Sequence, residues 1–245
     1  MRVFKLFVLT GLLFLPSFAS AQIALHSVGS TNSSTSTISI TPSSNIPAGS
    51  LIVVAVQDRN GGVGTMSVDG GGNSYTKAVQ QLFPGGGPPT AVIFYVYNCL
   101  AVSTAQSITY NNFGGGGSGS VMSVAYATGV QTLSNPLDVT ANASGSSASP
   151  TVTSAAPAVK NELFIGVLGT QNFTDALTQA SGWSSTMTIP GGFVDAMLIG
   201  DLINASTGTK TYNPTIAGSH DWAIVVASFK PGPVSTFIFT PAVIP

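Results

Sequence analysis

Apolar residues in this chain form short, nearly continuous blocks separated by Gly, Ser, Asn and Pro. Blocks such as "LIVVAV" (Leu51–Val56) and "FIGVL" (Phe164–Leu168) are rich in β-branched and aromatic residues, which favours strands. They are too continuous for strands with one wet face and indicate the central strands of a packed sandwich. The pattern predicts nine strands and no amphipathic helix: Thr35–Ile40, Leu51–Gln57, Ala91–Asn98, Ser107–Tyr110, Val121–Thr128, Leu163–Gly169, Val194–Ile203, Thr209–Tyr212 and Trp222–Phe229.

The order of these blocks repeats along the chain. Ala91–Tyr110 aligns with Phe193–Tyr212 at a shift of 102 residues, and both blocks end in "TYN". The same shift brings "SVMSVAYA" over "WAIVVASF", whereas "SLIVVAV" matches "ELFIGVL" at a shift of 112. Because the blocks agree in order, the sequence predicts an internal duplication of roughly a hundred residues, longer than a short solenoid repeat.

A sheet of the few strands in one copy exposes an apolar face that must be covered. Two copies stacked face to face give one antiparallel, jelly-roll-like sandwich, and two separate small sandwiches are the alternative. Residues 140–159, "TANASGSSASPTVTSAAPAV", are predicted to be a linker that is long enough for either arrangement.

Several of these blocks carry a resemblance. "NIPAGSLIVVAV", "VDGGGNSYTKAV", the "IFYVYN" strand and the closing "DWAIVVASFK" resemble uncharacterised jelly-roll-like β-sandwich modules of bacterial extracellular and phage tail-associated proteins. The resemblance covers about residues 38–230 and implies the fold. Its motifs are strands and turns and not catalytic signatures, so the resemblance implies no catalytic residues.

The first 21 residues are typical of a secretory signal peptide. Arg2 and Lys5 precede an apolar core, and "ASA" ends at Ala21 with the small residues that a signal peptidase cuts. We expect residues 22–231 to form the β-sandwich, with repeat halves at about 38–130 and 155–230, and residues 232–245 to form a C-terminal tail. No later run reaches the roughly 18 apolar residues of a membrane span. The sequence therefore predicts a secreted, extracellular or cell-surface protein.

Charge is scarce. Charged residues make up 6% of the chain, against about 25% in ordinary globular domains. Without the leader, 7 − 2 = 5 basic residues stand against 8 acidic ones, a net charge of −3. A nucleic-acid surface needs clustered Lys and Arg, so nucleic acid is not an expected partner. The polar surface must come from Ser, Thr, Asn, Gln and Gly, a composition common in adhesins, fibre proteins and sugar-binding sandwiches.

Metal and thiol chemistry have little support. Cys99 is the single cysteine, which excludes a disulfide framework. It is expected to be a small buried residue, with an intermolecular disulfide as the alternative. Asp58 and Asp69 lie in Asp/Asn/Gly-rich stretches that have the residue types of a calcium loop, yet turns favour the same residues. Calcium is thus the one cofactor considered.

Enzymatic constellations are weak. His220 and Asp221 are the most suggestive pair, but neighbours on a strand point to opposite faces, and no Gly-x-Ser-x-Gly elbow is present. We read the pair as a loop-end contact for solvent or a ligand. A glycan hydrolase, the third functional alternative, needs two facing carboxylates, and the chain has a single Glu, Glu162, at the start of a predicted strand.

A carbohydrate-binding module is the second alternative. Sugar rings stack on exposed aromatic residues with polar groups beside them. Tyr75 and Trp183, in corresponding turns of the two copies, are the candidates for stacking, with Asp69 and Asn73 as neighbouring acceptors. This reading requires both aromatic side chains to be exposed on one face.

The first functional hypothesis is a non-enzymatic surface, fibre or extracellular-matrix component. It rests on the signal peptide, the low charge, the lack of catalytic constellations and the tail, where "STFIFT" is uncharged and β-prone. An exposed strand of this kind can add to the sheet edge of a neighbour, which makes Phe237, Ile238 and Phe239 the candidate assembly strand. A tail that packs back on its own domain or frays is the alternative. The expected partner is a second copy or another surface protein, with a glycan as the alternative.

Overall fold

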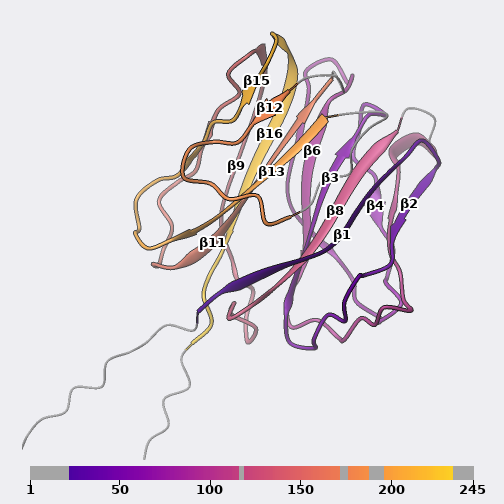
Figure 1. Cartoon of the computed structure of the whole chain (residues 1–245), viewed down its shortest axis with the longest axis vertical. Coiled ribbons are helices and arrows are strands. Elements are labelled where there is room, and N and C mark those ends of the chain that lie inside the picture. The colour runs from indigo at the N-terminus through magenta and orange to yellow at the C-terminus, as the bar shows by residue number, and fades with distance from the viewer. Residues whose placement is uncertain (1–21, 116–118, 172–175, 188–195, 234–245) are drawn as a thin grey trace, which may run out of the picture.

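The computed structural model describes residues 22–115, 119–171, 176–187 and 196–233. Within these residues the chain is built from antiparallel strands, with one short 3-10 turn at Phe113–Gly115. The predicted all-β sandwich is confirmed, and Figure 1 shows its sheets standing side by side as layers.

The first half of the chain forms a large sheet and a small one. The large sheet has the order β1-β8-β3-β6-β5 and the small sheet β2-β7-β4. Numbered along the chain, 1-8-3-6 beside 2-7-4 is the strand order of a jelly roll. The strands are β1 (Ala24–Ser33), β2 (Thr37–Ile40), β3 (Leu51–Asp58), β4 (Thr65–Met66), β5 (Thr76–Leu82), β6 (Thr90–Val96), β7 (Ile108–Asn111) and β8 (Ser120–Thr128).

The second half repeats this order. Its large sheet is β13-β11-β16-β9, and two-stranded sheets β10-β14 and β12-β15 lie outside it. If β9, β16, β11 and β13 are set against β1, β8, β3 and β6, the two large sheets match in order. The strands are β9 (Leu137–Ser147), β10 (Val152–Thr153), β11 (Glu162–Thr170), β12 (Leu177–Thr178), β13 (Ala196–Asn204), β14 (Thr211–Tyr212), β15 (Thr215–Ile216) and β16 (His220–Phe229).

The register of the central strands also corresponds. Leu51 lies opposite Ala127, and Leu163 lies opposite Phe229, which are the predicted shifts of 112 and 102. The third strand pair, β6 and β13, departs from the prediction by four residues: Val96 lies opposite Ile52, and Leu202 opposite Phe164. The connection after β6 (97–107) is longer than the one after β13 (205–210), so alignment on the shared "TYN" displaced this strand. The common order and register agree with a duplication, which remains our inference.

The two large sheets stack face to face and share a core. Val53, Ile93 and Ala125 of the first sheet are buried with Ile165 and Val225 of the second. Each large sheet is also covered on its outer face by its own small sheets, which creates two further cores. The structure therefore combines the two predicted arrangements. Each half is a small sandwich of its own, and the two halves also stack face to face through their large sheets.

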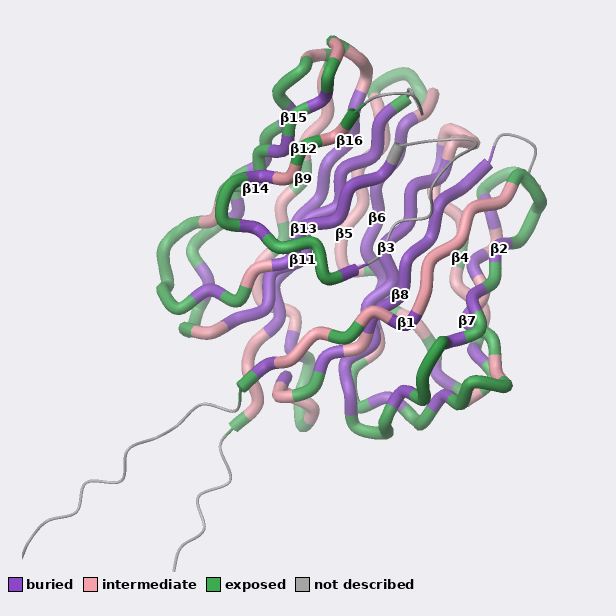
Figure 2. Tube along the Cα trace, in the orientation of Figure 1, coloured by how far each residue is buried: buried purple, intermediate pink, exposed green. Residues whose placement is uncertain are grey.

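This layering explains the continuous apolar blocks. Every residue of β3 and of β11 is buried, because both faces of the central strands meet another layer. Figure 2 shows the buried residues along the large-sheet strands and the exposed ones in the connections.

All nine predicted strands are present, and three long strands were missed: β1, β5 and β9. The predicted linker at 140–159 is wrong, because Thr140–Ser147 belongs to β9, which pairs with β16. The chain passes between the halves at 129–136 instead. The strand β9 lies at a sheet edge, where Ser, Thr and Asn replace the apolar residues of a central strand.

Candidate functional site

One end of the molecule brings together the connection between the halves and both ends of the described chain. The strands β3 and β11 begin at this end, and β8 and β16 finish there; we call it the base, and it is the lower end in Figure 1.

Gly129 contacts both ends of the described chain at the base. Its φ of +75° requires glycine, and a Cβ at this position would lie 2.4 Å from the carbonyl oxygen of Gln22. The Gly129 carbonyl accepts a hydrogen bond from Gly232 N–H at 2.7 Å, and Val130 forms a bridge with Pro231. The chain is thus held by backbone contacts until the last residues before the tail.

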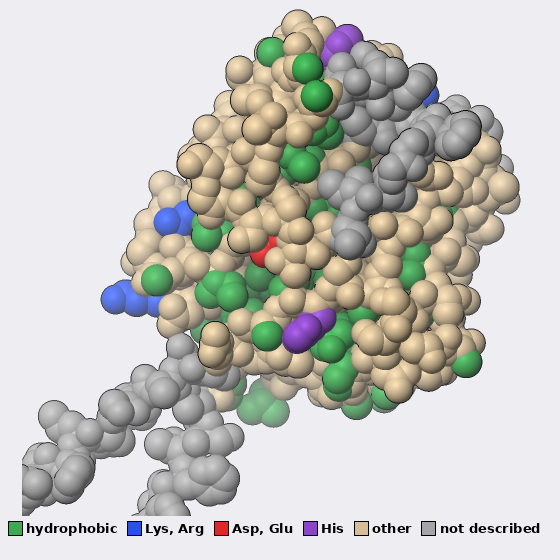
Figure 3. All heavy atoms as spheres, in the orientation of Figure 1, with side chains coloured by type: hydrophobic (Ala, Val, Ile, Leu, Met, Phe, Trp, Pro, Cys, Tyr) green, Lys and Arg blue, Asp and Glu red, His purple; other side chains and the backbone are tan. Residues whose placement is uncertain are grey.

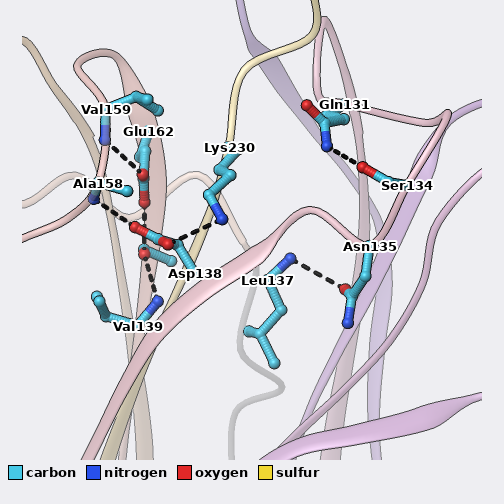
Figure 4. Close-up of polar contacts among 11 residues, drawn as sticks. Gln131, Ser134, Asn135, Leu137, Asp138, Val139, Ala158, Val159, Glu162 and Lys230 are labelled. Atoms are coloured by element: carbon cyan, nitrogen blue, oxygen red, sulfur yellow. Dashed lines mark hydrogen bonds and ion pairs between the residues drawn. The ribbon is translucent and has the colours of Figure 1, made fainter.

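A carboxyl pair lies beside this exit. Asp138 at the start of β9 and Glu162 at the start of β11 are hydrogen-bonded to one another. Lys230, the residue after β16, forms an ion pair with Asp138 at 2.9 Å, and Ser228 Oγ donates to Glu162 Oε2 at 2.6 Å. Figure 4 shows these side chains converging from three strand ends, with the backbone N–H groups of Ala158 and Val159 donating to the two carboxyl groups.

The pair holds one proton below about pH 7. Burial, and then the neighbouring Asp138 carboxylate, raise the pKa of Glu162 to about 7 against the opposing bond from Ser228. Burial also raises the pKa of Asp138, but hydrogen bonds from Ala158 N–H, Lys230 and Glu162 outweigh it and leave that pKa below its ordinary value. Glu162 therefore carries the proton and donates it to an ionised Asp138, whose charge Lys230 compensates.

This arrangement does not match a glycosidase. Retaining and inverting glycosidases hold their carboxyl groups about 5 Å or about 6.5–9.5 Å apart so that a sugar or a water fits between them. Asp138 and Glu162 are in direct contact, and Glu162 is completely buried. The pair can hold a proton, and its contacts link the starts of β9 and β11 to the end of β16.

Asp58, the first weak calcium candidate, is occupied by structural bonds. Its Oδ2 accepts from the Tyr110 hydroxyl at 2.8 Å and from Phe113 N–H at 2.9 Å. Its Oδ1 accepts from the backbone and side chain of Asn60. Within the described residues no cluster of three or more metal-ligating side chains occurs.

Asp69, the second calcium candidate, organises a turn. Its Oδ1 accepts from the N–H groups of Gly71 and Asn73, and its Oδ2 accepts from the Tyr75 hydroxyl at 2.7 Å. Asn73 in turn exchanges hydrogen bonds with the backbone of Leu100. Asp69, Asn73 and Tyr75 do lie together as a sugar site would need, but they are bonded to one another.

The stacking surface expected for sugar is not formed. Trp183 is 8% exposed, packs against Tyr212 at a centroid distance of 4.6 Å, and donates from Nε1 to the Thr211 carbonyl. Tyr75 is half-buried against the outer core of the first half, whereas Trp183 belongs to the outer core of the second. The two aromatic residues therefore do not share an exposed face, and this expectation is corrected.

His220 and Asp221 lie at the start of β16, opposite Ser147 and Ser146, so they point to opposite faces as predicted. Ser146 Oγ donates to Asp221. Cys99 is buried, with its Sγ 3.4 Å from the Pro47 carbonyl. The candidate assembly residues Phe237, Ile238 and Phe239 lie outside the described residues.

Sequence reasoning missed the pairing of Asp138 with Glu162 and Lys230. A signal was present, because Glu162 is the single Glu of the chain and opens a wholly apolar strand. A charge at such a position needs a partner when it is buried.

Among the described residues, no helix has the length and apolar character needed to cross a membrane. No protein-family model matches the chain, and no curated protein or solved structure matches it.

Proposed function

We propose that this protein is a secreted, non-enzymatic β-sandwich that serves as a surface, fibre or extracellular-matrix component and associates through its C-terminal tail. The proposal rests on the position of the two chain ends at the base. The first and last described residues lie together there, and the chain is tied down until Gly232. The tail that follows is uncharged and apolar, so it begins from a fixed point at one end of a rigid double sandwich.

Three further features support a structural role. The leader with Arg2 and Lys5 is typical of export. The carboxyl pair closes the sheet ends at the base and presents no space for a substrate. The aromatic residues suggested for sugar binding are engaged in the cores.

The test compares the chain from Gln22 to Pro245 with a version that ends at Pro233, which keeps the bond from Gly232 to Gly129. Light scattering measures the mass of each, and negative-stain microscopy shows the shape. We expect a larger species that disappears when the tail is removed. A compact monomer in both samples would refute association through the tail.

A further inference from the structure

The exposed apolar side chains are unevenly distributed. Seven large hydrophobic residues are exposed in the described part of the chain, and five of them lie in or next to the ends of large-sheet strands at the base. We call these five the basal apolar set: Tyr97, Leu100, Leu133, Val159 and Ile203. Leu133, in the connection between the halves, is 89% exposed. Figure 3 shows hydrophobic side chains along the lower edge of the molecule, near the point where both chain ends leave.

Exposed apolar side chains gathered at one end of an otherwise hydroxyl-rich protein favour contact of that end with another apolar surface. The matching segment leaves from the same end. Residues 234–245, "VSTFIFTPAVIP", contain no charge, and seven of the twelve are apolar. Twelve residues span up to about 40 Å when extended, which is enough to lie across the base of a neighbouring molecule.

We propose that two copies associate base to base, with the C-terminal segment of each lying on the basal apolar set of the other. This deepens the proposed function and rests on it. Donor and acceptor lie at the same end of each copy, so the contact is isologous and closes on itself. The assembly unit is therefore a closed dimer that does not grow into a filament by this contact.

The alternation of side chains along a strand favours a second copy over the segment's own base. In an extended segment, Phe237 and Phe239 point to one face and Ile238 to the other. A segment folded back on its own base leaves one of these faces in water. A segment held between two bases has both faces buried, and both basal sets are covered at once.

The first experiment traps the contact with cysteines placed in separate chains. Phe239→Cys protein is mixed with a size-tagged Leu133→Cys protein under mild oxidation, and the tagged heterodimer is measured by non-reducing electrophoresis. Phe113→Cys replaces Leu133→Cys in the matched control, because Phe113 is also exposed but follows β7 at the opposite end. Cys99 is buried in all chains. We expect the heterodimer with Leu133→Cys at least five times more abundant than with Phe113→Cys.

A chain that carries both Phe239→Cys and Leu133→Cys tests the competing occupant. An internal disulfide in a monomer, without the mixed heterodimer, would show that the segment covers its own base and would overturn the proposal. Equal trapping at Leu133 and Phe113 would overturn it too.

The second experiment measures mass. The double variant Tyr97→Ser/Leu133→Ser should lower the dimer fraction to that of the chain ending at Pro233, while Phe113→Ser should leave it unchanged. Tail-dependent filaments, or association that survives the double variant, would overturn the closed dimer and leave the proposed function standing. Monomers of the unaltered full chain would refute the proposed function itself.

Discussion

Glu162→Gln is the sharpest perturbation of the base, because glutamine imitates the protonated carboxyl group at the same volume. Its amide can donate to Asp138 in place of the carboxyl proton, and its oxygen can still accept from Ser228 Oγ. The variant thus removes the titration and keeps the contacts with Asp138 and Ser228, but its amide nitrogen cannot accept the 3.3 Å hydrogen bond from Val159 N–H.

The magnitude follows from the pKa. Burial and the Asp138 carboxylate raise the pKa of Glu162 from 4.5 to about 7 in the folded protein. Between these two values the folded protein holds a proton that the unfolded chain has lost, so the free energy of unfolding falls as the pH rises. The contribution is fully present below about pH 4.5 and is lost above about pH 7. At about 1.4 kcal/mol per pH unit, the whole window is worth at most about 3 kcal/mol.

The assay is urea unfolding between pH 5 and pH 8, followed by the fluorescence of the buried Trp183 and Trp222. We expect Glu162→Gln to lie up to about 1 kcal/mol below the unaltered protein at pH 5, because Val159 N–H loses its acceptor, and to exceed it by about 1–2 kcal/mol at pH 8. Glu162→Ala is the control for packing and should be destabilised at every pH, because it leaves the Ser228 hydroxyl and Val159 N–H without their acceptor. Parallel pH profiles for the glutamine variant and the unaltered protein would refute the shared proton.

Four other substitutions test the packing by the same unfolding assay. Tyr110→Phe should cost about 2–4 kcal/mol, because the hydroxyl donates to Asp58 and accepts from the backbone; Tyr212→Phe should be neutral or stabilising by up to about 1 kcal/mol, because its buried hydroxyl has no partner. An equal cost at both positions would contradict this. Gly200→Ala should cost about 1–3 kcal/mol, since its Cβ would lie 2.6 Å from the Tyr212 ring; an unchanged midpoint would show that the ring can move. Trp183→Ala should cost about 3–5 kcal/mol. A glycan that binds the unaltered protein and no longer binds this variant would restore a sugar site there.

The central strands could be predicted from the sequence because burial on two faces leaves a local signature. All eight residues of β3 are buried, so the apolar run is visible without knowledge of the partner strands. The edge strand β9 has no such signature. Its Asn142 donates to the Gln80 carbonyl of β5, and its Ser144 accepts from Gln81. Polar side chains that look like a linker are here used to join two sheet edges.

The base could be predicted only in part. Glu162 was correctly placed at the start of a strand, but its partners come from the beginning of β9 and the end of β16. Their contact depends on how β9, β16 and β11 pair with one another. Because the sequence pattern did not predict β9, Asp138 could not be recognised as a partner of Glu162. For Trp183 the sequence predicted an exposed side chain in a turn, but the side chain is buried against Tyr212. The Gly166–Gly200 pair makes room beneath Tyr212, and this pair can be recognised only once β11 and β13 are aligned.

The two halves use one strand order and solve the same packing problem differently. Tyr110 and Tyr212 occupy corresponding places in β7 and β14, and both are fully buried. In the first half, the residue opposite Val54 is Phe94, whose ring centroid lies 6.0 Å from that of Tyr110, and the Tyr110 hydroxyl donates to Asp58. In the second half, Gly166 faces Gly200, and the Tyr212 ring lies directly on the two glycines.

The first solution depends on a hydrogen-bonded carboxylate and the second on close contact, with Trp183 covering the Tyr212 ring from outside. The hydroxyl that is hydrogen-bonded in the first half is therefore unpaired in the second. Gly166→Val and Gly200→Phe should each destabilise the second half, alone or together, because both side chains would overlap the Tyr212 ring.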